Sequence, residues 1–536
     1  MPSRPAREAR PSEAPRLTQD LLLFALLFAA QMLLHAPLLR LPYFWDEAGY
    51  YVPAARDLYL TGTLIPHSTP SNAHPPLVMA WLALAWRAAG FSTLVTRTAM
   101  LAVAAFTLVG LFRLARAAAP PVVAWATLAL TAVYPVFFTQ SSLAHVDLAA
   151  AGLTFWGLAA YLEDRQGAAV FWFSLAGLAK ETAILTPLVL FAWEAVSPAA
   201  SARWRAFFPP ATRSLRAWRL LAPALPLAAW YAYHYARTGF LLGNPEYLRY
   251  NLTATLDPLR VPLALGLRLW QALGYFGLYL LTAGGLLALR RPAQASNGVP
   301  RLRIAPWIQV AFLAVFLAYL AFMSVAGGAV LARYLLPVVP LVILVMVSTI
   351  WRRVRYWRIV VILVGIAFVA GLFTNPPYGF ALEDNLAYRD YIAMHAEAAR
   401  FLSLRYPHAR VLTAWPASDE LSRPWLGYVS RPFPVVRVED FTPAQVGIAS
   451  RSAGQFDVAL VFSTKYQPTR PLLEDWLPWQ HLKEKYFGYH RDLPPEEIAA
   501  QLGARVVFQK NSDGQWVAVI AWEREENARL LPAPAP

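Results

Sequence analysis

The sequence predicts an α-helical polytopic membrane protein with about 11 transmembrane helices, followed by a C-terminal α/β domain outside the membrane. Hydrophobic residues make up 57% of the 536 residues and charged residues only 15%, whereas a soluble domain has about 25% charged residues. Apolar windows of spanning length recur up to residue 374 and are absent from the tail at 375–536. These observations exclude a disordered chain or a fibre.

A spanning helix needs roughly 20 mostly apolar residues. The windows that meet or approach this length are 19–40, 94–116, 120–138, 143–162, 168–181, 182–196, 218–236, 263–289, 304–326, 330–350 and 357–374. The fifth and sixth windows are short, so their division is the weakest part of the count. Residues 77–89 (LVMAWLALAWRAA) are apolar but too short to cross. We expect them to lie as a helix at the outer interface, which their tryptophans favour.

The distribution of charge predicts the orientation. The whole chain has a net charge of +15, but the tail at 375–536 has a net charge of −2 and the first 374 residues +17. Short cytoplasmic loops of membrane proteins carry such an excess of basic residues, so nucleic-acid binding is not expected. With residues 1–18 as a cytoplasmic N-terminal segment, the inner side of 11 spans holds 20 of the 30 basic residues among the first 374 and the outer side holds 10, which fits this orientation. No small-residue cleavage site follows its arginines, and we read the first helix as uncleaved.

The same orientation places the loop at 42–93 and the tail on the outer face of the plasma (inner) membrane. The tail contains strand-like runs at 410–414 (RVLTA), 457–462 (DVALVF) and 506–509 (VVFQ), and the last leads through Asn-Ser-Asp-Gly into 516–522 as a hairpin. Helical stretches at 385–405 and 494–503 alternate with them. Three parts are therefore expected: the segment 1–18, a transmembrane domain at 19–374, and an extracytoplasmic α/β domain at 375–536.

The absence of cysteine excludes thiolate nucleophiles and cysteine-ligated metal centres, and it leaves the redox compartment undetermined. Candidate chemistry therefore depends on charged groups close to the membrane, which are costly to keep there. The acidic pair Asp46-Glu47 follows the first window within Tyr43-Phe44-Trp45-Asp46-Glu47-Ala48-Gly49-Tyr50-Tyr51. An interfacial cleft and a solvated loop with an aromatic belt explain this pair equally well.

Three other positions on the same face attract attention. His74 precedes Pro75-Pro76-Leu77 at the start of the short interfacial helix, although a lone histidine is usually structural. Asp147 begins the fourth window at its outer edge, where an acid stabilised by the helix dipole is the simpler interpretation. Arg333-Tyr334 begin the tenth window within ARYLLPVVP.

Lys180 is the only lysine in the first 464 residues, and it stands with Glu181 inside apolar sequence near the outer end of its window. Pairing of these two neighbours is the structural interpretation. A cation held for an anionic lipid phosphate is the functional one. Each signal is weak by itself, but all of them converge on one face.

Taken together, these residues resemble the GT-C membrane glycosyltransferases, with the protein O-mannosyltransferase-like and lipid A aminoarabinose transferase groups as the most similar. The resemblance covers roughly residues 15–375. It rests on the acidic pair after the first span, a basic residue before Pro-Pro-Leu, an Asp at the outer end of a later span, a Lys-Glu break and an Arg-Tyr-Leu-Leu-Pro entry. His74 departs from the lysine that aminoarabinose transferases carry before Pro-Pro-Leu.

The resemblance implies transfer of a sugar from a polyprenyl-phosphate donor to a lipid, glycan or protein acceptor on the outer face. It implies that Asp46 is a general base or acceptor-orienting carboxylate, with Glu47 beside it and Asp147 as a second active-site carboxylate. It also implies that His74, Lys180 and the Arg333-Tyr334 pair hold the lipid phosphate. Asp46 and Asp147 could instead share a divalent cation, because both roles use carboxylate oxygens.

Two other classes remain as alternatives. A polytopic transporter or lipid flippase is disfavoured because no inverted repeat is evident and acidic residues are scarce at helix centres. A non-catalytic scaffold protein would not need the acidic pair. The cleft residues do not identify the sugar or the acceptor.

Overall fold

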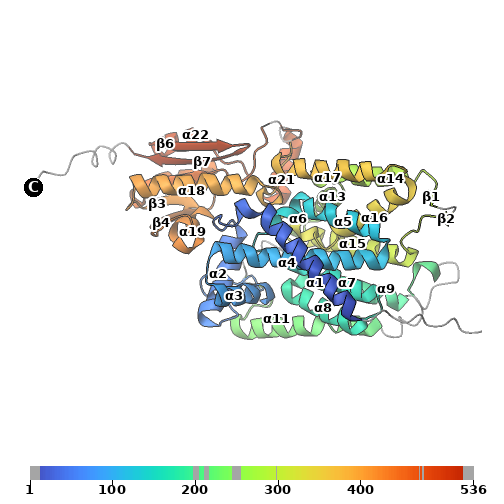
Figure 1. The fold of residues 1–536 in the computed structure, drawn as a ribbon. Helices are drawn as coiled ribbons and strands as arrows, with labels where there is room; N and C mark the ends of the chain where they lie inside the picture. The colour runs from blue at the N-terminus through green and yellow to red at the C-terminus, as the bar shows by residue number, and fades with distance from the viewer. Residues whose placement is uncertain are drawn as a thin grey trace, which may run out of the picture.

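A computed structural model describes residues 13–196, 205–209, 217–243, 245, 255–296, 299–469, 471–473 and 476–522. Most of the N-terminal segment 1–18 and the Pro-rich end of the chain lie outside these ranges. The described chain forms a helical bundle with a mixed sheet at one end, here called the sheet end (Figure 1).

The N-terminal half of the bundle and its outer segments consist of α1 (Glu13–Leu34), α2 (Val52–Thr61), α3 (Leu77–Ala89), α4 (Thr93–Ala118), α5 (Pro121–Val133), α6 (Pro135–Gln140), α7 (Asp147–Leu162), α8 (Gln166–Ala179) and α9 (Leu185–Val196). The rest of the bundle consists of α11 (Ala224–Thr238), α13 (Arg260–Leu273), α14 (Leu278–Ala288), α15 (Pro306–Val325), α16 (Val339–Arg353) and α17 (Trp357–Phe373).

Four described helical stretches are long and apolar enough to cross a membrane: Leu17–Leu34, Thr93–Ala118, Arg260–Ala288 and Pro306–Val325. Several shorter apolar helices complete the bundle, among them α3, which has the bounds expected for the interfacial helix. The total of 11 crossings stays a prediction. Close packing is visible between α4 and α7, where a Cβ added at Gly152 would lie 2.2 Å from Thr107 Oγ1. Small residues allow such close approach of helices inside a bilayer.

Prolines break several of the expected windows. The window at 120–138 divides into α5 and α6 at Pro135, and the window at 330–350 begins as the 3-10 turn η9 (Ala332–Leu335) before α16. Proline has no backbone N–H to donate and restricts the residue before it, so a regular helix cannot run through these positions. The breaks leave irregular backbone at the sheet end, and the polar side chains discussed below are attached there.

The C-terminal part contains α18 (Ala387–Arg405), α19 (Ala417–Ser422), α20 (Pro443–Arg451), α21 (Leu477–Phe487) and α22 (Pro495–Leu502) around strands β3 (Val411–Ala414), β4 (Val435–Val438), β5 (Val458–Phe462), β6 (Arg505–Ser512) and β7 (Gln515–Ala521). The strand order is β4-β3-β5-β7-β6. Strands β3, β4 and β5 are parallel, whereas β6 and β7 form the antiparallel hairpin expected from the sequence. A two-residue pair of strands, β1 (Ala295–Ser296) and β2 (Val299–Pro300), lies at the opposite end of the bundle (Figure 1).

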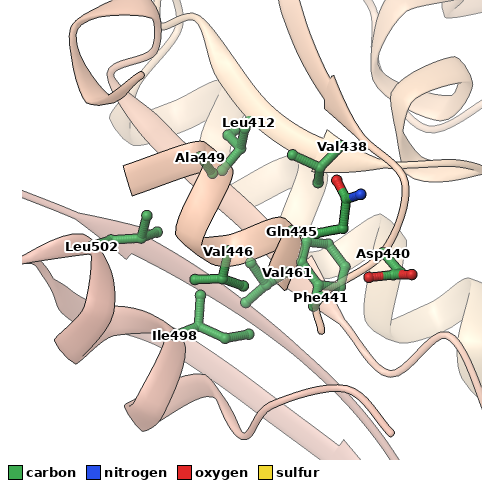
Figure 2. A pocket seen from close by; sticks show the side chains of 10 residues that line it. All are labelled: Leu412, Val438, Asp440, Phe441, Gln445, Val446, Ala449, Val461, Ile498 and Leu502. Atoms are coloured by element: carbon green, nitrogen blue, oxygen red, sulfur yellow. The ribbon is translucent and has the colours of Figure 1, made fainter. Parts of the chain in front are cut away.

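A small apolar space lies between the sheet and helices α20 and α22 (Figure 2). Leu412, Val446 and Ile498 are among the side chains that fill its walls, and Asp440 stands at its edge. The walls leave no room for a water molecule. The space is therefore part of the core of this region and has no features of a ligand site.

Candidate active site at the sheet end

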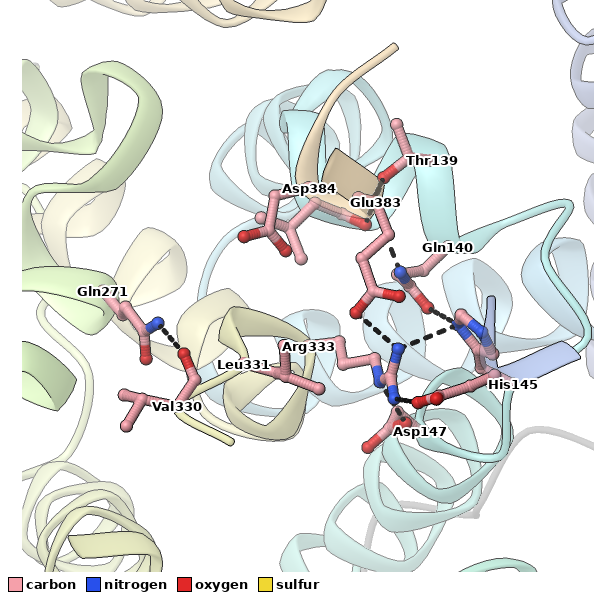
Figure 3. A network of polar contacts seen from close by, with 12 residues as sticks. Thr139, Gln140, His145, Asp147, Gln271, Val330, Leu331, Arg333, Glu383 and Asp384 are labelled. Atoms are coloured by element: carbon pink, nitrogen blue, oxygen red, sulfur yellow. Dashed lines mark hydrogen bonds and ion pairs between the residues drawn. The ribbon is translucent and has the colours of Figure 1, made fainter. Parts of the chain in front are cut away.

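The structure gathers three carboxylates from different segments around one guanidinium. Arg333, in the turn η9, contacts carboxylate oxygens of Asp46 and Glu383 and lies with its Nε 3.2 Å from Asp147 Oδ2. Its Nη1 also lies 3.4 Å from His145 Nδ1 (Figure 3). The Arg333 side chain is only 1% exposed. Residues far apart in the chain thus meet at the broken start of α16.

Asp46 is the most open carboxylate around Arg333. Its side chain is 21% exposed, against 2% for Asp147 and 4% for Glu383. Asp46 immediately precedes the π-helical turn η2 (Glu47–Tyr51), and the residue before it, Trp45, has a φ of 45°. A left-handed conformation is unfavourable for a bulky residue and persists only where the surroundings hold it.

The C-terminal part supplies that support. The Trp45 ring lies edge-on to Trp415, with the ring centres 5.3 Å apart, and also contacts Tyr391. Phe44 packs between Tyr388 and Tyr391 of α18. The turn that carries Asp46 is therefore fixed by aromatic packing against the region that follows residue 375.

Lys180 pairs with Asp147 and not with its neighbour in sequence. Its Nζ lies 2.5 Å from Asp147 Oδ1, in the break between α8 and the 3-10 turn η3 (Glu181–Ile184). The same Nζ lies 3.8 Å from the centre of the Tyr334 ring. A cation over an aromatic face is attracted by the ring quadrupole. Four of the predicted residues, Asp147, Lys180, Arg333 and Tyr334, are thus in one contact group with Asp46.

His74 lies beside this group and makes its own pair. Its Nδ1 is 2.8 Å from Glu181 Oε2. Lys180 and Glu181 are adjacent in the sequence, but they therefore pair with different residues, Asp147 and His74. Tyr51 bridges the two clusters, because its ring stacks on His74 at 5.9 Å and contacts His145 at 5.7 Å.

Glu47 points away from the group around Arg333. It is completely buried and forms an ion pair with Arg97, with Arg97 Nη2 2.9 Å from Glu47 Oε2. The backbone N–H groups of Phe44 and Ala144 also donate to Glu47, at 3.0 and 2.6 Å. Both Glu47 oxygens are therefore occupied by groups that fix the loop. Glu47 pairs with Arg97, whereas its neighbour Asp46 pairs with Arg333.

Two acidic residues of the site were not predicted. Glu383 and Asp384 form the turn η10 (Leu382–Asp384) just after the last apolar window, and Asp384 Oδ2 accepts a hydrogen bond of 2.8 Å from the Tyr275 hydroxyl. Burial raises the pKa of Asp384 to about 7. Burial raises the pKa of Glu383 as well, together with the nearby carboxylates and against the effect of Arg333. An acidic pair directly after a span is the same signal that singled out Asp46-Glu47.

Arg268 was also missed. It is fully buried on α13, and its guanidinium carbon lies 5.5 Å from the centre of the Tyr334 ring. Its N–H groups donate to Gln271 Oε1 at 3.0 Å and to the carbonyl oxygen of Leu331 at 2.6 Å. Among the described residues, no carboxylate lies within ion-pair distance of it. An arginine inside an apolar window was the signal available in the sequence.

The predicted metal alternative finds little support. In the described ranges, no three or more His, Asp and Glu side chains are arranged to hold a metal ion. Asp46 and Asp147 share the Arg333 guanidinium, and a metal ion at the same place would be repelled by it. These residues do not fit a divalent cation, and no step below involves one.

Comparison with known proteins identifies the fold. The chain aligns with the structure of ArnT from Cupriavidus metallidurans bound to undecaprenyl phosphate with a TM-score of 0.50 and 14% identity, over 98% of this chain and 100% of that chain. The apo structure of the same ArnT gives 0.50 and 13%, over 94% and 98%. An Archaeoglobus fulgidus oligosaccharyltransferase in complex with Zn and sulfate gives 0.41 and 12%, over 85% and 67%, and nothing below rests on it.

No protein-family model and no curated protein sequence matches the chain. The chain has the fold of the ArnT structures, as the resemblance to GT-C membrane glycosyltransferases predicts, and four of its described helical stretches have the length and composition to cross a membrane.

Proposed function

We propose that this protein is a membrane glycosyltransferase that moves a sugar from a polyprenyl-phosphate donor to an acceptor on the outer face of the plasma membrane. The observation that carries the proposal is the position of Asp46. It is the most open carboxylate of a buried group in which Arg333, Lys180 and Arg268 surround the Tyr334 ring. In this proposal the sheet end faces outward, and the region 375–536 covers the site as an extracytoplasmic α/β domain.

The chemistry follows from these side chains. Asp46 accepts the proton of an acceptor hydroxyl as the oxygen attacks the anomeric carbon of the donor sugar. The bond between that carbon and the phosphate oxygen breaks, and the polyprenyl phosphate leaves with one additional negative charge. Buried cations stabilise a developing charge more strongly than cations in water do. The phosphate therefore needs no proton from the protein.

Lys180, which is paired with one carboxylate, and Arg268, which has neutral partners among the described residues, are the cations best placed to hold the phosphate. Arg333 is already engaged by three carboxylates, so its role is to position Asp46 and Asp147. Arg268 has neutral partners among the described residues, which leaves its positive charge available to an anion. Both cations lie against the Tyr334 ring, with Lys180 Nζ 3.8 Å and the Arg268 guanidinium carbon 5.5 Å from its centre. His74 does not contact these cations directly; it holds Glu181, the residue that follows Lys180 in the sequence.

Glu47 is a positioning residue in this proposal, because its four hydrogen-bonding contacts are all structural. Asp147 is the second carboxylate of the site and keeps Lys180 and Arg333 together. The similarity to the ArnT structure bound to undecaprenyl phosphate supports a polyprenyl-linked donor. Neither the sugar nor the acceptor follows from these contacts.

The test is turnover by the purified protein in lipid nanodiscs with a panel of labelled polyprenyl-phosphate sugars and candidate acceptors. We expect release or transfer of the sugar from one donor by the wild type and none by Asp46→Asn. Glu397→Gln is the matched control, since Glu397 is an exposed acid on α18 that pairs with Lys510. A transporter would instead move substrate across sealed vesicles without forming a covalent product, and this result would overturn the proposal.

A further inference from the structure

An exposed apolar edge marks the segment around the start of α21. Leu472, Leu473, Trp476 and Leu477 are exposed to 71%, 57%, 58% and 65%. Isolated exposed leucines are common in proteins, but four large exposed apolar side chains within six residues, on both sides of Glu474 and Asp475 in the sequence, indicate an interaction surface. The four residues are here called the apolar edge.

The contacts of this segment place it across the ends of two helices of the bundle. The backbone N–H of Leu472 donates to the carbonyl oxygen of Pro377 at 2.9 Å, just beyond the end of α17. At the other end of the segment, Arg260 Nε donates to the carbonyl oxygen of Tyr486 at 3.0 Å, at the start of α13. The Arg260 guanidinium also lies 5.4 Å from the centre of the Phe487 ring. Figure 1 shows α21 beside these helix ends, at the sheet end of the bundle.

The helix ends below the apolar edge are themselves exposed and apolar. Phe373, the last residue of α17, is 64% exposed, and Leu259, directly before α13, is 62% exposed. In a membrane, exposed apolar residues of a spanning helix face lipid. The apolar edge thus continues the lipid-facing surface of the bundle at the level where the helices end.

We propose that the apolar edge inserts into the outer leaflet of the bilayer and seats the C-terminal region on the membrane. Tryptophan and leucine at the boundary between acyl chains and headgroups are typical of segments that lie in the interface plane. Lys483 and Lys485 on α21 are balanced in the same stretch by Glu474, Asp475 and Glu484, so the apolar side chains, and not charge, would carry the attachment. The partner is the lipid surface itself, and the proposal does not depend on the catalytic assignment.

The absence of cysteine allows a direct test, because each introduced cysteine can be labelled alone. Leu473→Cys and Leu477→Cys would each carry a nitroxide in full-length protein in lipid nanodiscs. Electron paramagnetic resonance then compares collisions with oxygen, which dissolves in lipid, and with a nickel chelate, which stays in water. Leu313→Cys, on the exposed face of α15, is the lipid reference, and Leu404→Cys, 76% exposed on α18, is the aqueous reference.

We expect both labels on the apolar edge to give an oxygen-to-nickel collision ratio well above that at position 404 and below that at position 313, because the edge lies nearer to the headgroups than residue 313 does. A ratio close to that at position 404 would show that the edge lies in water and would overturn the proposal. Shielding from both reagents would show that another protein surface covers the edge, which would overturn it as well. Leu472→Cys provides a third position if one label disturbs folding, judged by gel filtration and thermal unfolding.

Discussion

Replacing Glu47 by glutamine removes one charge from a completely buried ion pair while keeping the shape of the side chain. One carboxylate oxygen receives Arg97 Nη1 and the Ala144 N–H, and the other receives Arg97 Nη2 and the Phe44 N–H. In either orientation, the amide nitrogen of glutamine would face two N–H donors. The Arg97 charge would also lose its partner. Breaking one side of a buried ion pair costs about 3–5 kcal/mol.

The measurement is thermal unfolding of the purified protein in nanodiscs. From the size of this free-energy loss we expect the apparent melting temperature of Glu47→Gln to fall by about 5 °C or more. Glu397→Gln should leave it unchanged, because that acid forms an exposed ion pair, which contributes little to stability. A Glu47→Gln protein as stable as the wild type but without transferase activity would refute the positioning role. It would indicate that Glu47 takes part in the reaction itself.

Three further predictions concern the cations and the buried acid. Lys180→Met should weaken binding of polyprenyl phosphate about tenfold to a hundredfold, because a hydrogen bond to a charged group contributes about 1.5–3 kcal/mol, whereas Lys510→Met should bind normally in the same titration. Arg268→Gln should weaken the same binding without changing the affinity for an uncharged polyprenol; equal loss for both lipids would contradict a role in phosphate binding. The pKa of Asp384 is raised from 3.8 to about 7, so the folded state binds more protons than the unfolded state between these values and stability falls as pH rises through that range. Asp384→Asn should remove this fall, seen as a smaller difference in melting temperature between pH 5 and pH 8 than in the wild type, and an unchanged difference would contradict it.

The helical, apolar character of the first 374 residues was accessible from the sequence because hydropathy and the spacing of apolar windows reflect the bilayer, whereas the number of crossings and their orientation stay predictions. The same reasoning singled out Asp46, Lys180 and Arg333, since charged groups near a membrane are few and each one stands out. The prolines at these breaks were visible in the sequence: Pro135 begins α6, Pro337 lies between η9 and α16, and Pro340 lies in the first turn of α16. Their consequence, irregular backbone gathered at the sheet end, needed the tertiary structure.

Pairing could not be predicted in this way. Lys180 and Glu181 are neighbours in sequence, but the break after α8 turns one toward Asp147 and the other toward His74. Glu383 was overlooked because it follows the last window, in a tail that carried no recognised motif. The separation of Asp46 from Glu47 was equally hidden, because adjacent residues face different directions in the turn that Trp45 begins.

The most direct test of the central claim measures donor binding and turnover on the same preparation of Asp46→Asn. The structure predicts that this variant binds the polyprenyl-phosphate sugar with nearly the wild-type affinity, because Lys180 and Arg268 remain in place, while its turnover falls to background. Full turnover by Asp46→Asn would contradict the account, because no other carboxylate around Arg333 is equally open among the residues that the structure describes.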